Sequence, residues 1–106
     1  MSYRYMRILV FYDLPVETYA EQKEYRRFQK SLIKSGYIMM QESVYCKLAL
    51  NNSIVKSEKQ KLYKNKPHCG IVQVLVVTEK QFAQIEYIVG KKSNIKEDRD
   101  DRLIVL

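Results

Sequence analysis

The sequence predicts an α+β fold, a ferredoxin-like βαββαβ sandwich with an extra C-terminal strand, assembled as a two-fold dimer. Residues 8–12 and 71–77 are apolar at nearly every position, as is typical of central strands covered on both faces. Segments with helix-start signals lie between the strand segments, and the two central-looking strands come first and third. This order matches the split βαβ plan, in which the helices cover only one face of the sheet.

Length and charge bound the classes of function. The chain has 106 residues, which we interpret as one domain spanning residues 1–106. Its net charge of +7 comes from 19 basic and 12 acidic residues and suggests a polyanionic partner. No apolar run is long enough to span a bilayer, and the first residues lack the core of a signal peptide, so we expect a cytoplasmic protein with no membrane partner. Cys46 and Cys69 form no metal-ligand pair, and we expect both to be buried.

The first central strand ends in a single carboxylate. Pro15 cannot donate a backbone hydrogen bond to a sheet, so the strand that contains residues 8–12 should end near Asp13. The Asp13 side chain then either faces the space beyond a rigid strand end or accepts from backbone amides in a turn. The residues alone leave both interpretations open.

The first helix should carry a basic face. Thr18-Tyr19-Ala20-Glu21 is a capping box, which predicts a helix that begins there and ends at Gly36. At about 100° per residue, its apolar side holds Phe28, Leu32 and Ile33. Its opposite side holds five cations: Lys23, Arg26, Arg27, Lys30 and Lys34. Glu21 and Glu24 fall away from that side, so we expect it to contact phosphates in preference to being merely solvated.

Residues 37–50 alternate between apolar and amphipathic side chains, which predicts a long half-buried strand. Glu42 interrupts its apolar face, so a bulge or bend near Glu42 and Ser43 should turn the carboxylate out to water. A second helix is expected over residues 54–65, and we interpret its scattered lysines as solubilising. His68, the only histidine, lies beside a proline in a turn and should be a surface residue.

The last third of the chain holds the second central strand, 71–77, and then a capping box, Thr78-Glu79-Lys80-Gln81, that opens a short helix. A brief strand is expected at 86–89. Region 91–106 reads as a charged connector plus a C-terminal strand, 103–106, for dimer or partner contacts. Because the helices cover one face of the sheet, a second copy of the chain is the simplest cover for the other apolar face. The C-terminal strand can then pair with the partner's sheet edge.

Several stretches in this order resemble a known family, the small second protein of the universal CRISPR adaptation pair. They span nearly the whole chain and include Arg4-Tyr5-Met6-Arg7, Tyr12-Asp13-Leu14-Pro15, Tyr25-Arg26-Arg27-Phe28, Gln41-Glu42-Ser43-Val44-Tyr45 and Val77-Thr78-Glu79-Lys80-Gln81-Phe82-Ala83. The first and last look most like members from type II systems. Glu42 departs from the pattern, since many relatives have an aromatic or other uncharged residue there.

The resemblance implies a symmetric dimer that bridges integrase subunits and supports the double-stranded DNA to be inserted. In some members, the aspartate after the first strand binds a divalent ion at the dimer axis and has been assigned nuclease activity. The resemblance implies that Asp13 is this aspartate here, tentatively with one shared Mg²⁺. It also implies DNA contacts by basic residues of the first helix and beyond the fourth strand, which here are Arg26, Arg27, Lys30, Lys91 and Lys92.

Two functions lead. The first is an architectural subunit of the spacer acquisition complex that binds double-stranded DNA, and the alternative is a Mg²⁺-dependent endonuclease acting on single-stranded RNA or double-stranded DNA, with Asp13 as its catalytic residue. The sequence favours the architectural role, because one Asp in each chain supplies few metal ligands. A toxin-type ribonuclease is a distant third reading. An RNA-recognition module is disfavoured, since residues 71–77 lack the stacking aromatics that it needs.

Overall fold

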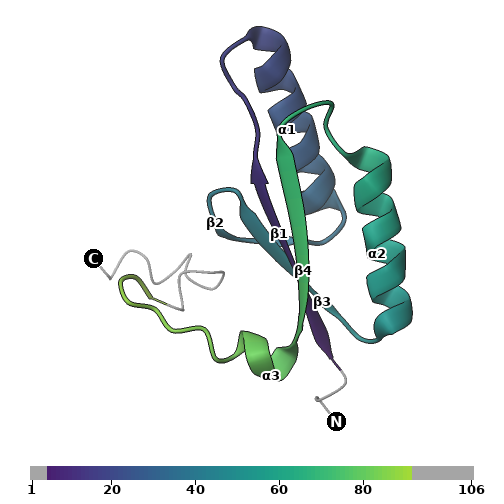
Figure 1. The fold of residues 1–106 in the computed structure, drawn as a ribbon, viewed down its shortest axis with the longest axis vertical. Coiled ribbons are helices and arrows are strands. Elements are labelled where there is room, and N and C mark those ends of the chain that lie inside the picture. The colour runs from purple at the N-terminus through teal and green to yellow at the C-terminus, as the bar shows by residue number, and fades with distance from the viewer. Residues whose placement is uncertain (1–4, 92–106) are drawn as a thin grey trace.

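The computed structural model describes residues 5–91 and has the predicted βαββαβ order, followed by one short helix (Figure 1). Its elements are β1 (Met6–Asp13), α1 (Tyr19–Lys34), β2 (Ile38–Gln41), β3 (Val44–Ala49), α2 (Asn52–Asn65), β4 (Ile71–Thr78) and α3 (Glu79–Phe82). The strands form one antiparallel sheet in the order β2-β3-β1-β4. β1 is therefore central, as predicted, whereas β4 lies at an edge of the sheet within the described residues.

The core lies between the sheet and the two long helices. The even-numbered side chains of β1 point into it, and Ile8 and Val10 are completely buried. α1 contributes Phe28 and Leu32, and α2 contributes Val55 and Leu62. Alternation along the strand thus sends every second residue of β1 toward the helices. Of the predicted apolar side of α1, only Ile33 is misplaced, since it is 56% exposed on the last turn of the helix.

The helix-start signals are confirmed. The Thr18 hydroxyl accepts from the Glu21 amide while the Glu21 carboxylate accepts from the Thr18 amide, and Thr78 and Gln81 repeat the arrangement at α3. At α2 the Asn51 side chain accepts from the Ile54 amide. Such caps satisfy backbone donors that have no partner inside the helix, so these boundaries depend on a few neighbouring residues.

The segment predicted as one long strand is a hairpin of β2 and β3. The register shifts between Met39 and Gln41, and Ser43 has a positive φ of 68°, which completes a tight turn. The Tyr12 amide donates to the Ser43 carbonyl at 3.1 Å, so β1 anchors that turn. Glu42 is exposed, as expected from the interruption of the apolar pattern.

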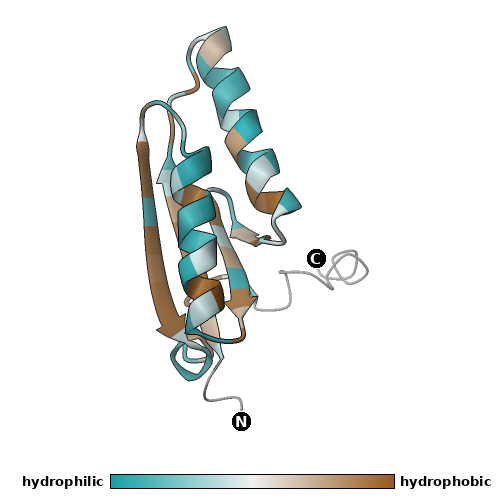
Figure 2. Cartoon of the chain, turned by 90° about the vertical axis from the view of Figure 1, so that its right-hand side faces the viewer, coloured by the Kyte–Doolittle hydropathy of each residue, from teal (hydrophilic) through white to brown (hydrophobic). Residues whose placement is uncertain are grey.

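The sheet face away from α1 and α2 is also apolar. β4 is brown along nearly its whole length in Figure 2, and Leu75 on this face is 52% exposed. Residues 85–89 lie over part of the face and, with Leu9, Phe11 and Val44, line a cavity of about 390 Å³. The strand predicted at 86–89 is wrong, because this segment lies over side chains of the sheet face and pairs with no strand among the described residues. The predicted strand at 103–106 lies outside the described residues.

A buried ion pair joins α2 to β3. Glu58 of α2 is only 4% exposed, and its Oε2 atom lies 2.7 Å from Lys47 Nζ and 3.5 Å from Lys61 Nζ. Lys47 Nζ also donates to the Ser35 carbonyl at 2.6 Å, and the Tyr37 hydroxyl donates to Glu58 Oε1 at 3.4 Å. Burial, together with the adjacent Glu58 carboxylate, raises the pKa of Tyr37 well above its ordinary value. Lys47 thus compensates a carboxylate that the fold has removed from water.

Replacing Lys47 with methionine should lower the free energy of unfolding by about 2 kcal/mol, because it leaves a buried carboxylate without its shortest charged hydrogen bond. Lys61→Met is the matched control. The Lys61 side chain is 53% exposed and its ammonium group is more distant, so its loss should cost no more than about 0.5 kcal/mol. Urea denaturation of the two variants measures both values, and equal losses would contradict the assignment of Lys47 as the main partner.

Candidate metal site and nucleic-acid interface

Asp13 is the last residue of β1 and is exposed. Its neighbour Tyr12 is 5% exposed and packs edge-on against Phe28 of α1, with ring centroids 5.3 Å apart. Because consecutive strand residues point to opposite faces, Asp13 is directed to the face opposite the helices. The strand end thus holds a water-accessible carboxylate on a rigid element.

A glycine fixes the backbone beside this carboxylate. Asp13 pairs with Ile71 at the start of β4, and Gly70, just before it, has a positive φ of 94°. A Cβ atom at position 70 would lie 2.7 Å from Leu14 Cδ2 and 2.9 Å from the Asp13 carbonyl oxygen. Only glycine allows this approach without a shift of the backbone. The role of Gly70 was not predicted, although a glycine directly before a strand is a signal for a close approach of two backbones.

One chain alone offers a sparse metal site. Within residues 5–91, no three His, Cys, Asp or Glu side chains come together in a group that could hold a metal ion. Mg²⁺, however, keeps several waters and is commonly held by one or two carboxylates plus substrate phosphates. Two copies of Asp13 brought together by a dimer would fit that requirement.

All five cations of the basic face of α1 are exposed, and four of them differ from Arg27 in their ion pairing. Lys23, Arg26, Lys30 and Lys34 are exposed, and none of them forms an ion pair with the part of the chain that the structure describes. They are spaced along a helix whose Phe28 and Leu32 side chains are buried in the core. These four side chains can therefore approach a polyanion without first breaking a salt bridge within the described residues.

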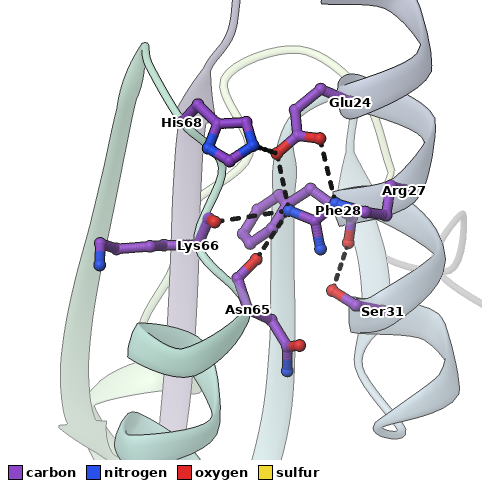
Figure 3. A network of polar contacts seen from close by, with 7 residues as sticks. All are labelled: Glu24, Arg27, Phe28, Ser31, Asn65, Lys66 and His68. Atoms are coloured by element: carbon purple, nitrogen blue, oxygen red, sulfur yellow. Dashed lines mark hydrogen bonds and ion pairs between the residues drawn. The ribbon is translucent and has the colours of Figure 1, made fainter.

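Arg27 differs from its neighbours. Its guanidinium donates to both carboxylate oxygens of Glu24, at 3.1 and 2.8 Å, and to the Asn65 carbonyl at 3.0 Å (Figure 3). The hydrogen bond from Arg27 lowers the pKa of Glu24. The expectation that Glu24 lies away from the cations is wrong, and their i, i+3 spacing is the signal that could have revealed the pair. Arg27 ties α1 to the end of α2, so it is a structural residue as well as a candidate phosphate contact.

The remaining candidates lie near the ends of the described region. Lys91 is exposed, and Lys92 lies outside the described residues. The His68 side chain is 91% exposed, as predicted, and its Nε2 atom lies 3.9 Å from Glu24 Oε2 (Figure 3). Cys46 is buried as predicted, whereas Cys69 is exposed because it lies in the turn before β4. No helix among residues 5–91 is both long and apolar enough to cross a membrane.

Together, the fold and the strand-end carboxylate define a small ferredoxin-like protein with one exposed acidic residue on its central strand. A sequence model of the family described as CRISPR associated protein Cas2 matches residues 6–85. The chain belongs to this family, in agreement with the resemblance seen in the sequence.

Individual relatives support the assignment. The CRISPR-associated endoribonuclease Cas2 of Treponema denticola is 51% identical over 105 residues, which cover 95% of this chain and 100% of that protein. The CRISPR-associated endoribonuclease Cas2 of Ligilactobacillus salivarius is 43% identical, with 95% and 100% covered. A solved structure described as a crystal structure of cas2 has a TM-score of 0.58 at 20% identity and covers 88% of this chain and 92% of its own. That structure supports the fold.

Proposed function

We propose that this protein is a Mg²⁺-dependent endonuclease that hydrolyses phosphodiester bonds in RNA, with Asp13 from two subunits holding the ion. The observation that carries the proposal is the exposed Asp13 carboxylate on a rigid strand end. The names of the two relatives above support RNA as the substrate, since both are called endoribonucleases. A bound Mg²⁺ would supply a Lewis acid for a phosphate oxygen and a more acidic water.

The dimer in this proposal uses the apolar face of the sheet. Leu9 and Phe11 lie on that face, and by strand alternation Asp13 is directed to the same face. Leu75 and Ile71 on neighbouring β4 are 52% and 57% exposed, which is a large apolar area for a single chain to leave in water. A two-fold interface presents the same patch twice. Burying this face would therefore bring both Asp13 residues to one interface.

The proposal predicts that cleavage depends on the dimer even when Asp13 is intact. Leu75→Lys places a charge on the apolar face and should give a monomer by light scattering, with loss of RNA cleavage in Mg²⁺. Ile33→Lys is the matched control, since Ile33 is also an exposed apolar residue, at 56%, but lies on α1. It should keep both the dimer mass and the activity. A monomeric Leu75→Lys variant that cleaves RNA at the normal rate would refute the shared site.

A second candidate is supported by the basic face of α1. We infer that this face binds double-stranded DNA, as an architectural subunit that acts with an integrase partner in spacer acquisition. Arg26 and Lys30 are exposed on a helix fixed by the core, and a dimer would present the surface twice. The candidate contact set also includes Arg27, Lys91 and Lys92. Arg27 would have to contact phosphate while its guanidinium is held by Glu24. This role and the nuclease role use different residues, so they can coexist.

A further inference from the structure

α2 carries a basic stripe with an aromatic residue in its middle. Its members are Lys56, Lys59 and Tyr63 of the helix and the C-cap residue Lys66, hereafter the α2 stripe; they follow one another at spacings of three or four residues and are all exposed. Such spacing places side chains on one side of a helix. Tyr63 is 73% exposed, so most of this residue is accessible to a ligand. The stripe includes neither Asp13 nor any residue of α1, although Arg27 of α1 donates to the Lys66 carbonyl at 3.4 Å.

No carboxylate neutralises the α2 stripe from its own helix. Glu58 is the only acidic residue of α2, and it is buried and paired with Lys47 and Lys61. The fold has thus withdrawn the one acid of the helix into the core, where it pairs with no lysine of the stripe. The lysines of α2 were predicted to be scattered and solubilising, but they have distinct places. Lys61 pairs with the buried Glu58, and Lys56 and Lys59 belong to the stripe.

The α2 stripe borders a groove beside β4. A cavity of about 280 Å³ is lined by Lys59, Leu62, Tyr63, Lys66, Val72 and Val74. Its apolar lining comes from the helix and from the edge strand, and two lysines and Tyr63 complete the lining. Because β4 is an edge of the sheet among the described residues, the groove is bordered by a strand with one open side. The groove therefore combines apolar and aromatic residues, which suit a flat apolar group, with lysines, which suit anions.

We propose that this groove binds a single-stranded segment of nucleic acid, with a base stacked on Tyr63 and the flanking phosphates paired with Lys59 and Lys66. A duplex would satisfy the lysines but keeps its bases stacked inside, so the Tyr63 ring and the apolar lining would gain nothing. An acidic peptide would likewise use the cations and leave the ring without a flat partner. The inference goes beyond the proposed function, since this binding needs neither Asp13 nor a metal ion.

The test measures binding of a fluorescent oligo(U) of about 12 nucleotides by anisotropy, in EDTA so that no cleavage occurs. Tyr63→Ala should weaken binding by about 5- to 150-fold, the range expected for loss of one base–aromatic stack. Tyr63→Phe should retain most of the affinity because it keeps the ring. The double variant Lys59→Gln/Lys66→Gln should make the dependence of log K on log salt shallower by about 1.4, for two lost phosphate contacts on a single strand.

Tyr19→Ala is the matched control, because Tyr19 is equally exposed at 73% but has Glu17 and Glu21 as sequence neighbours. It should bind oligo(U) like the unmodified protein. Binding of a blunt duplex should be unchanged in Tyr63→Ala. Equal oligo(U) affinity in Tyr63→Ala and Tyr19→Ala would overturn the proposal. So would a competition experiment in which poly-glutamate, at the same concentration of charge, displaces the labelled oligo(U) as well as unlabelled oligo(U) does.

Discussion

Replacing Asp13 with alanine should abolish Mg²⁺-dependent cleavage of RNA. Asp13 is the only residue we assign to the ion. Removing it should therefore lower activity by more than the roughly 100-fold upper range that is typical for removing an outer-shell partner of a metal. Asp13→Asn should lose activity as well, because it keeps the shape of the side chain and removes its negative charge. The measurement is the initial rate on a labelled RNA as Mg²⁺ is titrated, with double-stranded DNA of matched sequence as the second substrate.

The controls for this experiment separate the two proposed functions. Glu17→Ala removes an exposed carboxylate close to Asp13 in sequence and should cleave normally. Asp13→Ala should remain a dimer, because it removes a carboxylate and leaves the apolar side chains of the sheet face in place. It should still bind duplex DNA and support integration, because the basic face of α1 is unchanged. Normal cleavage by this variant would remove Asp13 from the chemistry. A folded, dimeric variant that fails in integration would instead make the ion part of the architectural function.

Charge reversal on α1 should weaken binding to duplex DNA strongly. Arg26→Glu/Lys30→Glu changes two exposed cations in each subunit, or four in a dimer, and replaces attraction to phosphate by repulsion. If all four contact phosphates, the salt dependence of binding should become shallower by up to about 3.6 in the slope of log K against log salt. Both residues lie outside the core, so the thermal unfolding temperature should change little.

Lys80→Glu is the control for charge alone, because Lys80 is exposed on α3, away from this face. It should alter the slope far less than the double variant does. Arg27→Gln should behave differently again, since it breaks the bond between α1 and the end of α2 and should lower stability more than it lowers DNA affinity. Equal affinity and equal slope in Arg26→Glu/Lys30→Glu would show that the face is only solvated.

The features that the sequence predicted well are those determined by near neighbours. The capping boxes at Thr18 and Thr78 each involve residues three apart, and the central position of β1 follows from its unbroken apolar run. The hairpin of β2 and β3 was harder to see, because the alternation of side chains continues across the turn at Ser43. That turn depends on a hydrogen bond from Tyr12, about thirty residues away in the chain.

The candidate site shows the same division. Asp13 could be placed from the run before it and the proline after it. The contact of Gly70 with the Asp13 backbone depends on the pairing of β1 with β4, which no local pattern contains. The α2 stripe was also out of reach, since it becomes distinct only when Glu58 is known to turn inward and pair with Lys47. Pairing between distant elements is what local periodicity leaves out.

The two cysteines differ in a way that is useful for spectroscopy. Cys46 is buried, and burial raises the pKa of its thiol, so little reactive thiolate is available there. Cys69 is exposed in the turn before β4, next to the glycine that contacts the Asp13 backbone. A maleimide dye should therefore attach at one site in the unmodified protein. Its emission would report on events at the strand end, such as arrival of a metal ion or of a second subunit, without an engineered handle.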